Sequence, residues 1–289
     1  MSMSRRTFLK STTSAAVAGS AVWAGQERAA AQSSPQLQLV RNATCRISYG
    51  GKTILLDPWL GDVGSYPPVR NAPNPRPNPL VALPMPVDQV LAGVDATLIT
   101  HTHFDHWDAA ERNRVPKTAP LFVQPADRDR LVQAGYTDVR IVDQRMVWEG
   151  ITITRTAAQH GTGETGVRMG AVSGYVLSRT GLPTVYIAGD TVWFDGVAAA
   201  LRDHRPDVVI VNAGEAMFNE GGPIIMGLDD VAKVCAGAPR ARVIAVHLEA
   251  VNHCMLTRDT LRAGLERTGL LPRVQIPRDG ETLTLSASM

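Results

Sequence analysis

The sequence predicts a layered α/β fold, in which β-sheets are covered by helices. Short apolar segments of strand length come first in close succession and then alternate with segments of helical periodicity. The chain of 289 residues is 44% hydrophobic and 19% charged, a balance typical of globular proteins. No repeat of short period is found, but the order of the predicted elements allows two similar halves.

The first 31 residues are expected to be an export signal and not part of the fold. Residues 4–10 contain paired arginines, an apolar stretch follows, and three alanines at 29–31 resemble a cleavage site. The arginine pair resembles the twin-arginine signal of bacteria. The apolar stretch is too short to span a bilayer, so no stable membrane anchor is expected. We therefore predict a signal at 1–31 and one mature domain at 32–289, periplasmic or secreted, with the twin-arginine export machinery as a partner.

Removing this segment changes the net charge of the chain. The segment has four basic side chains and one acidic one, so the charge of +2 for the whole chain becomes −1 for residues 32–289. A nearly neutral chain without a basic run predicts no nucleic-acid partner. Cys45, Cys235 and Cys254 lack the spacing of a metal site, and free buried thiols are favoured over a disulfide, which stays open.

Three strands are predicted first, at 37–40, 44–49 and 52–56, separated by the turn residues Asn42 and Gly50-Gly51. Nine prolines then fall between positions 58 and 86, which excludes a helix interior or a central strand. This segment is interpreted as a loop at the mouth of a site, with a linker between domains as the alternative.

The remaining chain is predicted to alternate strands and helices. A short helix at 87–92 precedes a buried strand at 95–100. Further strands are predicted at 120–124, 139–142, 147–158, 171–179, 184–188, 207–212, 242–247, 274–276 and 281–285. Helices are predicted at 126–134, 195–202, 228–236 and 257–267, and a glycine-rich loop at 214–227.

Three of the seven histidines fall in the hexapeptide His101-Thr102-His103-Phe104-Asp105-His106. It follows a buried strand, where α/β proteins commonly bind ligands. Imidazole nitrogens and carboxylate oxygens are ligands of zinc and similar divalent metals. So short a backbone cannot easily aim four such groups at one point, so two adjacent metals fit better than one. Further candidate ligands also follow predicted strands: His160, Asp190 and His247.

The order of these groups resembles the metallo-β-lactamase-fold hydrolases: the hexapeptide, a later histidine, Gly189-Asp190-Thr191 and a histidine at a strand end. The likeness extends from about residue 37 to the C-terminus. The early Leu56-Asp57-Pro58-Trp59-Leu60 resembles the branch that contains ascorbate-6-phosphate lactonase and related lipid phosphodiesterases. The resemblance implies an αββα sandwich of two similar βα halves in one domain, with metals at one edge between the sheets.

The resemblance also implies two divalent metal ions as cofactors, with zinc expected first and manganese or iron as alternatives. By position, the implied ligands of the first metal are His101, His103 and His160. Those of the second are Asp105, His106 and His247, with Asp190 as a bridge between the metals. Asp57 and Thr100 are expected to orient imidazoles from outside the ligand set.

The function that follows is an exported dinuclear metal-dependent hydrolase of small molecules, in which the metals activate a shared water. Asp105, Asp190 and His253 are the expected catalytic residues; His253 is the candidate proton donor, with a packed or surface histidine as the alternative. A lactone or other ester is the first substrate class, and a phosphodiester of the phospholipid type the second. A non-catalytic metal-binding module is the alternative from another class. An oligomer is left open.

Replacing both arginines of the signal by lysine (R5K/R6K) is expected to leave a folded, metal-loaded precursor in the cytoplasm. The twin-arginine route characteristically carries folded proteins, and metal binding should be coupled to folding because the ligands are far apart in the sequence. Fractionation of cells that produce the variant checks this. Mature-length protein in the periplasm in normal amount would indicate the general secretory route instead.

Overall fold

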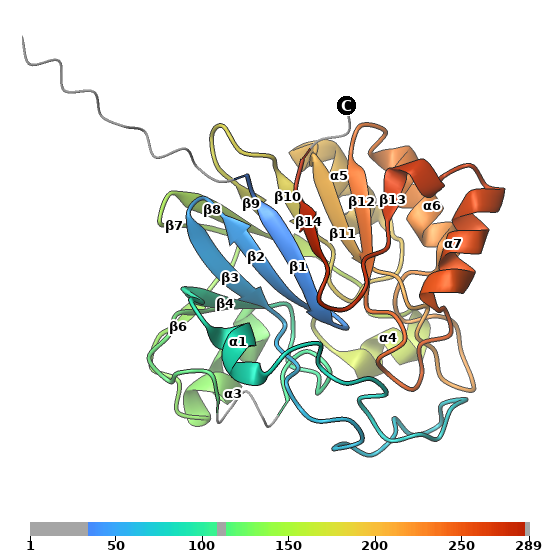
Figure 1. Cartoon of the computed structure of the whole chain (residues 1–289), viewed down its shortest axis with the longest axis horizontal. Coiled ribbons are helices and arrows are strands. Elements are labelled where there is room, and N and C mark those ends of the chain that lie inside the picture. Colours follow the sequence, from blue (N-terminus) through green and yellow to red (C-terminus); the bar gives the residue numbers. More distant parts are fainter. Residues whose placement is uncertain (1–33, 109–113, 287–289) are drawn as a thin grey trace, which may run out of the picture. The chain divides into compact units, whose positions relative to one another are not determined.

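The computed structural model describes residues 34–108 and 114–286, so the predicted export signal lies outside the described residues. Two seven-stranded mixed sheets face each other, and helices lie on their outer faces (Figure 1). This confirms the predicted α/β class and the αββα sandwich. In the described part of the chain, no helix is long and apolar enough to cross a membrane.

The first sheet has the strand order β14-β1-β2-β3-β4-β5-β6. Its strands are β1 (Gln36–Arg41), β2 (Thr44–Tyr49), β3 (Lys52–Leu56), β4 (Ala96–Ile99), β5 (Leu121–Val123), β6 (Val139–Ile141) and β14 (Thr282–Thr284). The second sheet has the order β13-β12-β11-β10-β9-β8-β7. Its strands are β7 (Arg145–Trp148), β8 (Ile151–Ala157), β9 (Ser173–Ser178), β10 (Val185–Ile187), β11 (Val208–Asn212), β12 (Arg242–Val246) and β13 (Val274–Gln275).

Both sheets follow one pattern of strand directions. In the first, β14, β1, β2 and β3 pair antiparallel, and β3 to β6 pair parallel. In the second, β7 to β10 pair antiparallel, and β10 to β13 pair parallel. The sheets are therefore the two similar halves that the resemblance implies. Because the carboxyl ends of parallel strands meet at one edge of a sheet, the loops after these strands converge.

Strand β11 shows how the core is divided. Val208 and Ile210 belong to the cluster between the two sheets, whereas Val209 and Val211 belong to the cluster under the helices. Side chains alternate between the two faces of a strand, so a strand covered on both faces is apolar throughout. The same two clusters bury the free thiols of Cys45 and Cys235.

The helices cover the outer faces of the sheets. Helices α5 (Asp195–His204), α6 (Leu228–Gly237) and α7 (Arg258–Arg267) lie over the second sheet (Figure 1). Helices α1 (Val87–Leu91) and α3 (Arg128–Gln133) pack beside the first. The start of α7 is fixed by a capping box, in which the Thr260 backbone N–H donates to Thr257 Oγ1 at 3.1 Å. Two short 3₁₀ helices lie at Pro125–Asp127 and Leu271–Arg273.

The structure differs from the predicted elements in one strand and one helix. The single strand expected at 147–158 is wrong: Glu149 and Gly150 adopt left-handed backbone conformations, with φ of 51° and 76°, and turn the chain between β7 and β8. The sequence also does not predict helix α4 (Gly163–Met169), because glycine disfavours a helix interior. A Cβ at Gly166 would lie 2.7 Å from the carbonyl oxygen of Gly161, so glycine is needed for this close approach.

A buried arginine fixes the proline-rich loop to the first sheet. Arg41 is 0% exposed, and its guanidinium donates to the backbone carbonyls of Trp59 at 2.6 Å, Gly61 at 3.0 Å and Val81 at 3.1 Å. It also lies 4.7 Å from the centre of the Trp59 ring. Both ends of the loop are thus tied to one strand end, which agrees with a site-mouth loop and not with a linker between domains.

The Arg41→Ala variant is expected to lose about 3 kcal/mol of unfolding free energy, because two buried carbonyls and one partly buried carbonyl lose a charged donor. Arg46→Ala is the matched control, since Arg46 also donates to three backbone carbonyls, those of Gln89, Val90 and Ala92, but is half-buried. Its loss is expected to be about 1 kcal/mol. Urea unfolding measures both values, and equal losses would contradict the role assigned to burial.

Candidate metal centre

The predicted ligands gather where strands of both sheets end. His101, His103, Asp105 and His106 follow β4 of the first sheet. From the second sheet, His160 follows β8, Asp190 follows β10 and His247 follows β12. All of these strands run in the same direction within their sheet, so their carboxyl ends lie at one edge of the sandwich.

The ligand atoms form two groups, within each of which the atoms lie within 4.8 Å of one another. The first group consists of His101, His103 and His160, and the second of Asp105, His106, Asp190 and His247. Asp190 lies between the groups, because its Oδ2 is 3.1 Å from His106 Nε2 and 3.3 Å from His160 Nε2. A carboxylate in this position can contribute to both groups.

Asp57 orients two imidazoles of the first sheet. It follows β3 in a left-handed conformation with φ of 40°, and its Oδ2 lies 2.9 Å from His106 Nδ1. The Thr100 hydroxyl donates to the same oxygen at 2.6 Å, and the Thr100 backbone N–H donates to Oδ1 at 2.7 Å. Thr100 Oγ1 is in turn 3.1 Å from His101 Nδ1. With their Nδ1 atoms engaged, both rings present Nε2 to the centre.

The imidazoles of the second sheet are oriented in the same way. His160 Nδ1 lies 2.8 Å from the carbonyl oxygen of Ile224, and His247 Nδ1 lies 3.6 Å from Cys254 Sγ. His247 adopts a left-handed backbone conformation with φ of 62°. Gly214 packs so closely that a Cβ there would lie 2.2 Å from the His247 carbonyl oxygen. A glycine at 214 is therefore required for the position of this ligand.

The Nε2 atom of His101 tests whether these residues fit a metal. It is buried and has no hydrogen-bond partner, and Asp190 Oδ2 lies 3.8 Å away, beyond hydrogen-bond distance. Buried polar atoms are rarely left without a partner. Imidazole nitrogens and carboxylate oxygens that converge on a small volume form the donor set that zinc and similar divalent cations prefer. The residues fit divalent metals.

The buried carboxylates of the centre require positive charge beside them. Burial alone would raise the pKa of Asp190, but attraction by His106, His247 and His160 outweighs it and holds the pKa well below the usual range. Burial alone would lower the pKa of His106, but Asp190, Asp105 and Asp57 outweigh it and raise the pKa to about 10. A proton or a metal cation has to balance these carboxylates.

A cavity of about 180 Å³ opens beside the ligands. It is lined by Val69, His103, Phe104, Asp105, His160, Met169, Asp190, Phe218 and His253. The structure thus brings His253 to the same cavity as the ligands. Its buried ring stacks on that of Phe218, with centroids 6.0 Å apart, and its Nδ1 has no hydrogen-bond partner. Burial lowers the pKa of His253 to about 4, so the imidazole is neutral at pH 7.

Sequence reasoning missed several residues of this site. Val69, Phe104 and Met169 form an apolar wall, and single apolar residues outside a periodic pattern carry no recognisable signal. Asn212 donates to Asp190 Oδ1 at 2.6 Å. Asn212 ends β11, so its position at a strand end, shared with the predicted ligands, is the signal that could have indicated it.

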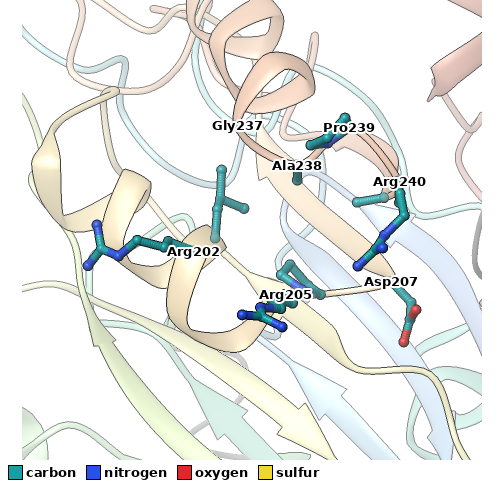
Figure 2. Close-up of a pocket in the computed structure, with 10 residues that line it drawn as sticks. Arg202, Arg205, Asp207, Gly237, Ala238, Pro239 and Arg240 are labelled. Carbon is teal, nitrogen blue, oxygen red and sulfur yellow. The ribbon is translucent and has the colours of Figure 1, made fainter.

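A larger cavity, of about 420 Å³, lies where α5 and α6 end, and Figure 2 shows residues that line it. Arg202, Arg205, Asp207 and Arg240 border it at the amino end of β11. The carboxyl end of the same strand, at Asn212, contacts the metal centre. None of the predicted metal ligands lines this second cavity, so the chemistry belongs to the smaller one.

Comparison with known sequences agrees with this geometry. The Beta-lactamase superfamily domain matches residues 52–248. The UPF0173 protein YddR of Bacillus subtilis (strain 168) is 38% identical over 253 residues, which cover 85% of this chain and 98% of that protein. A UPF0173 metal-dependent hydrolase of Myxococcus xanthus is 27% identical over 248 residues, covering 82% of this chain and 78% of that protein.

Two solved structures are similar over most of the chain. An isothiocyanate hydrolase from Delia radicum gut bacteria has a TM-score of 0.83 and 37% identity, and the match covers 87% of this chain and 99% of that one. A possible metal-dependent hydrolase from Veillonella parvula has a TM-score of 0.85 and 36% identity, covering 87% of this chain and 100% of that one. The chain therefore belongs to the UPF0173 family of metal-dependent hydrolases with the metallo-β-lactamase fold.

Proposed function

We propose that the protein is a dinuclear metal-dependent hydrolase of small, uncharged compounds with an electrophilic carbon. Isothiocyanates are the first class, and lactones and other esters the second. The observation that carries this proposal is the cavity of about 180 Å³, in which apolar side chains face the metal ligands. None of the described residues that line it is a lysine or an arginine, so an uncharged substrate fits better than an anionic phosphodiester.

The order of the two classes follows from the comparisons. The solved structure that is 37% identical to this chain is described as an isothiocyanate hydrolase. The lactone or ester class rests on the resemblance of the sequence around Asp57 to the lactonase branch. Both classes join a compact electrophilic group to an organic substituent, which Val69, Phe104, Met169 and Phe218 can contact.

In the proposed reaction, the two ligand groups would hold divalent cations, which would supply hydroxide near neutral pH and positive charge beside the reacting atom. Asp190 fixes the spacing of the groups, and the apolar wall binds the substituent and excludes bulk water. The neutral imidazole of His253 lines the cavity, where it can accept a proton from the attacking water and pass it on to the leaving atom. With an isothiocyanate, the central carbon forms a double bond to the oxygen of water, and its double bond to nitrogen breaks. Nitrogen takes both protons of water, which gives an amine and carbonyl sulfide.

The metal-loaded protein is expected to release amine from short alkyl isothiocyanates, with a kcat/KM at least about tenfold above that for bis(p-nitrophenyl) phosphate, because none of the described residues that line the cavity is a lysine or an arginine. Simple lactones and p-nitrophenyl esters test the second class. A chelator should abolish turnover, and zinc, manganese or iron should restore it. A preference for the phosphodiester would contradict the proposal, and no turnover of any class at full metal content would support a non-catalytic metal-binding module.

Two variants separate metal binding from proton transfer. The wild type is expected to bind about two metal ions per chain, and Asp190→Ala to lose metal and turnover while keeping its circular dichroism spectrum, since apolar packing holds β10. His253→Ala is expected to keep its metal and lose about 100-fold in kcat. Asp195→Ala, at an exposed residue that begins α5, is the control. Unchanged turnover in Asp190→Ala, or at most one metal in the reconstituted wild type, would contradict the dinuclear site.

A further inference from the structure

One wall of the cavity is a closed loop from the proline-rich segment, residues 66–78, which we call the strap. Its two ends pair with each other: the Tyr66 N–H donates to the Asn78 carbonyl, and the Asn78 N–H donates to the Tyr66 carbonyl, both at 2.8 Å. Within the strap, Val69 lines the cavity beside the metal ligands. The position of the strap therefore sets how much room remains between Val69 and the centre.

Asn252 holds the strap in place. It is 1% exposed, and its Oδ1 accepts from the Val69 N–H at 3.0 Å and from Asn78 Nδ2 at 2.8 Å. Its Nδ2 donates to the carbonyls of Val69 at 3.3 Å and Asn74 at 2.5 Å. The Asn252 backbone N–H also donates to Asn78 Oδ1 at 2.8 Å. Both hydrogens and both lone pairs of the buried amide are thus used on one segment.

The segment that carries Asn252 also carries parts of the site. His247 is a predicted metal ligand, and His253 lines the cavity next to Asn252. Val69 packs in one apolar cluster with Trp59 and Phe104, whose ring centroids are 5.8 Å apart. The ligand, the candidate proton donor and the anchor of the strap therefore share one short stretch of backbone.

Asn219 makes a second attachment to the strap, in which the side-chain hydrogen bond is longer than the backbone one. The Asn219 backbone N–H donates to the Asn71 carbonyl at 2.7 Å, and the exposed Asn219 side chain donates to Asn71 Oδ1 at 3.3 Å. Removing the Asn219 side chain leaves the backbone bond intact. Asn219 is therefore a matched control for Asn252, because it is also an asparagine that is hydrogen-bonded to the strap.

We infer that Val69 is a specificity-determining residue and that Asn252 is the positioning residue that fixes it through the strap. A β-branched side chain has one strongly preferred rotamer, and a satisfied buried amide holds the backbone that bears it. The cavity then admits slender substituents and disfavours bulky ones. The substrate preference rests on the proposed function. The role of Asn252 in fixing the strap is independent of the substrate.

The first readout needs no substrate. Hydrogen exchange of the strap amides is measured on the metal-loaded full chain. In Asn252→Ala the Val69 amide is expected to exchange at least about tenfold faster than in the wild type, because its acceptor is lost. In Asn219→Ala it is expected to stay within about twofold. Should Asn252→Ala not fold, Asn252→Leu replaces it, since leucine has nearly the same shape and likewise removes the acceptor of the Val69 N–H.

The second readout is selectivity, taken as the ratio of kcat/KM for 2-phenylethyl isothiocyanate to that for allyl isothiocyanate. Val69→Ala is expected to raise this ratio about tenfold or more, and Val69→Phe to lower it by a similar factor. Asn252→Ala should raise KM for allyl isothiocyanate and move the ratio toward one, with kcat within about threefold and metal content unchanged. A purely structural role for Asn252 would lower kcat and stability and leave the ratio in place.

The outcomes of the two readouts are distinct. A wild type that hydrolyses no substrate removes the proposed function and the substrate preference with it, while hydrogen exchange still decides whether Asn252 fixes the strap. In an active enzyme, a selectivity ratio that stays within twofold in both Val69 variants overturns the inference. So does equal exchange of the strap amides in the wild type and the Asn252 variant.

Discussion

His106 is held at both ring nitrogens by carboxylates, one from each half of the molecule. Its Nδ1 lies 2.9 Å from Asp57, which follows β3, and its Nε2 lies 3.1 Å from Asp190, which follows β10. Strands β3 and β10 are the central strands of their sheets and hold equivalent positions in them. Buried charges of this kind persist only when they are matched, so the two sheets must meet at one fixed distance for the centre to exist. The other ligands are arranged around this contact.

Several residues at this edge, Asp57 and His247 among them, are held in backbone conformations that side chains other than glycine rarely adopt. Asp57 has φ of 40° and His247 has φ of 62°. Each costs about 1–2 kcal/mol relative to an ordinary conformation. The surrounding contacts sustain it: Thr100 donates twice to Asp57, and Gly214 leaves room for the backbone of His247. Strain of this kind is concentrated where ligand geometry matters more than local stability.

The sequence predicts those features whose residues lie close together along the chain, and it does not predict those that depend on contacts between distant residues. The apolar run of β11 and the ligands of the hexapeptide are readable because their meaning lies within a few residues. The turn at Glu149 and Gly150 was hidden by apolar residues on both sides. Gly166 of α4 is required by its close approach to the Gly161 carbonyl oxygen, which helix propensity does not describe. Val69 and Asn252 meet across 183 positions of sequence, and no local pattern records such a pairing.

Each ligand group takes residues from both sheets. His101 and His103 come from the first sheet and His160 from the second, and the other group is divided in the same way. Cations bound by these groups would therefore join the two sheets at the ligand edge, in addition to the apolar packing between the sheets and hydrogen bonds such as that from the Tyr175 hydroxyl to the Ile99 carbonyl at 3.3 Å. A force that separates the two sheets from the ligand edge would then have to break metal–ligand bonds in one group after the other. Without metals, protonated imidazoles such as that of His106 have to balance the buried carboxylates, and we expect this edge to be the end from which the sandwich opens first.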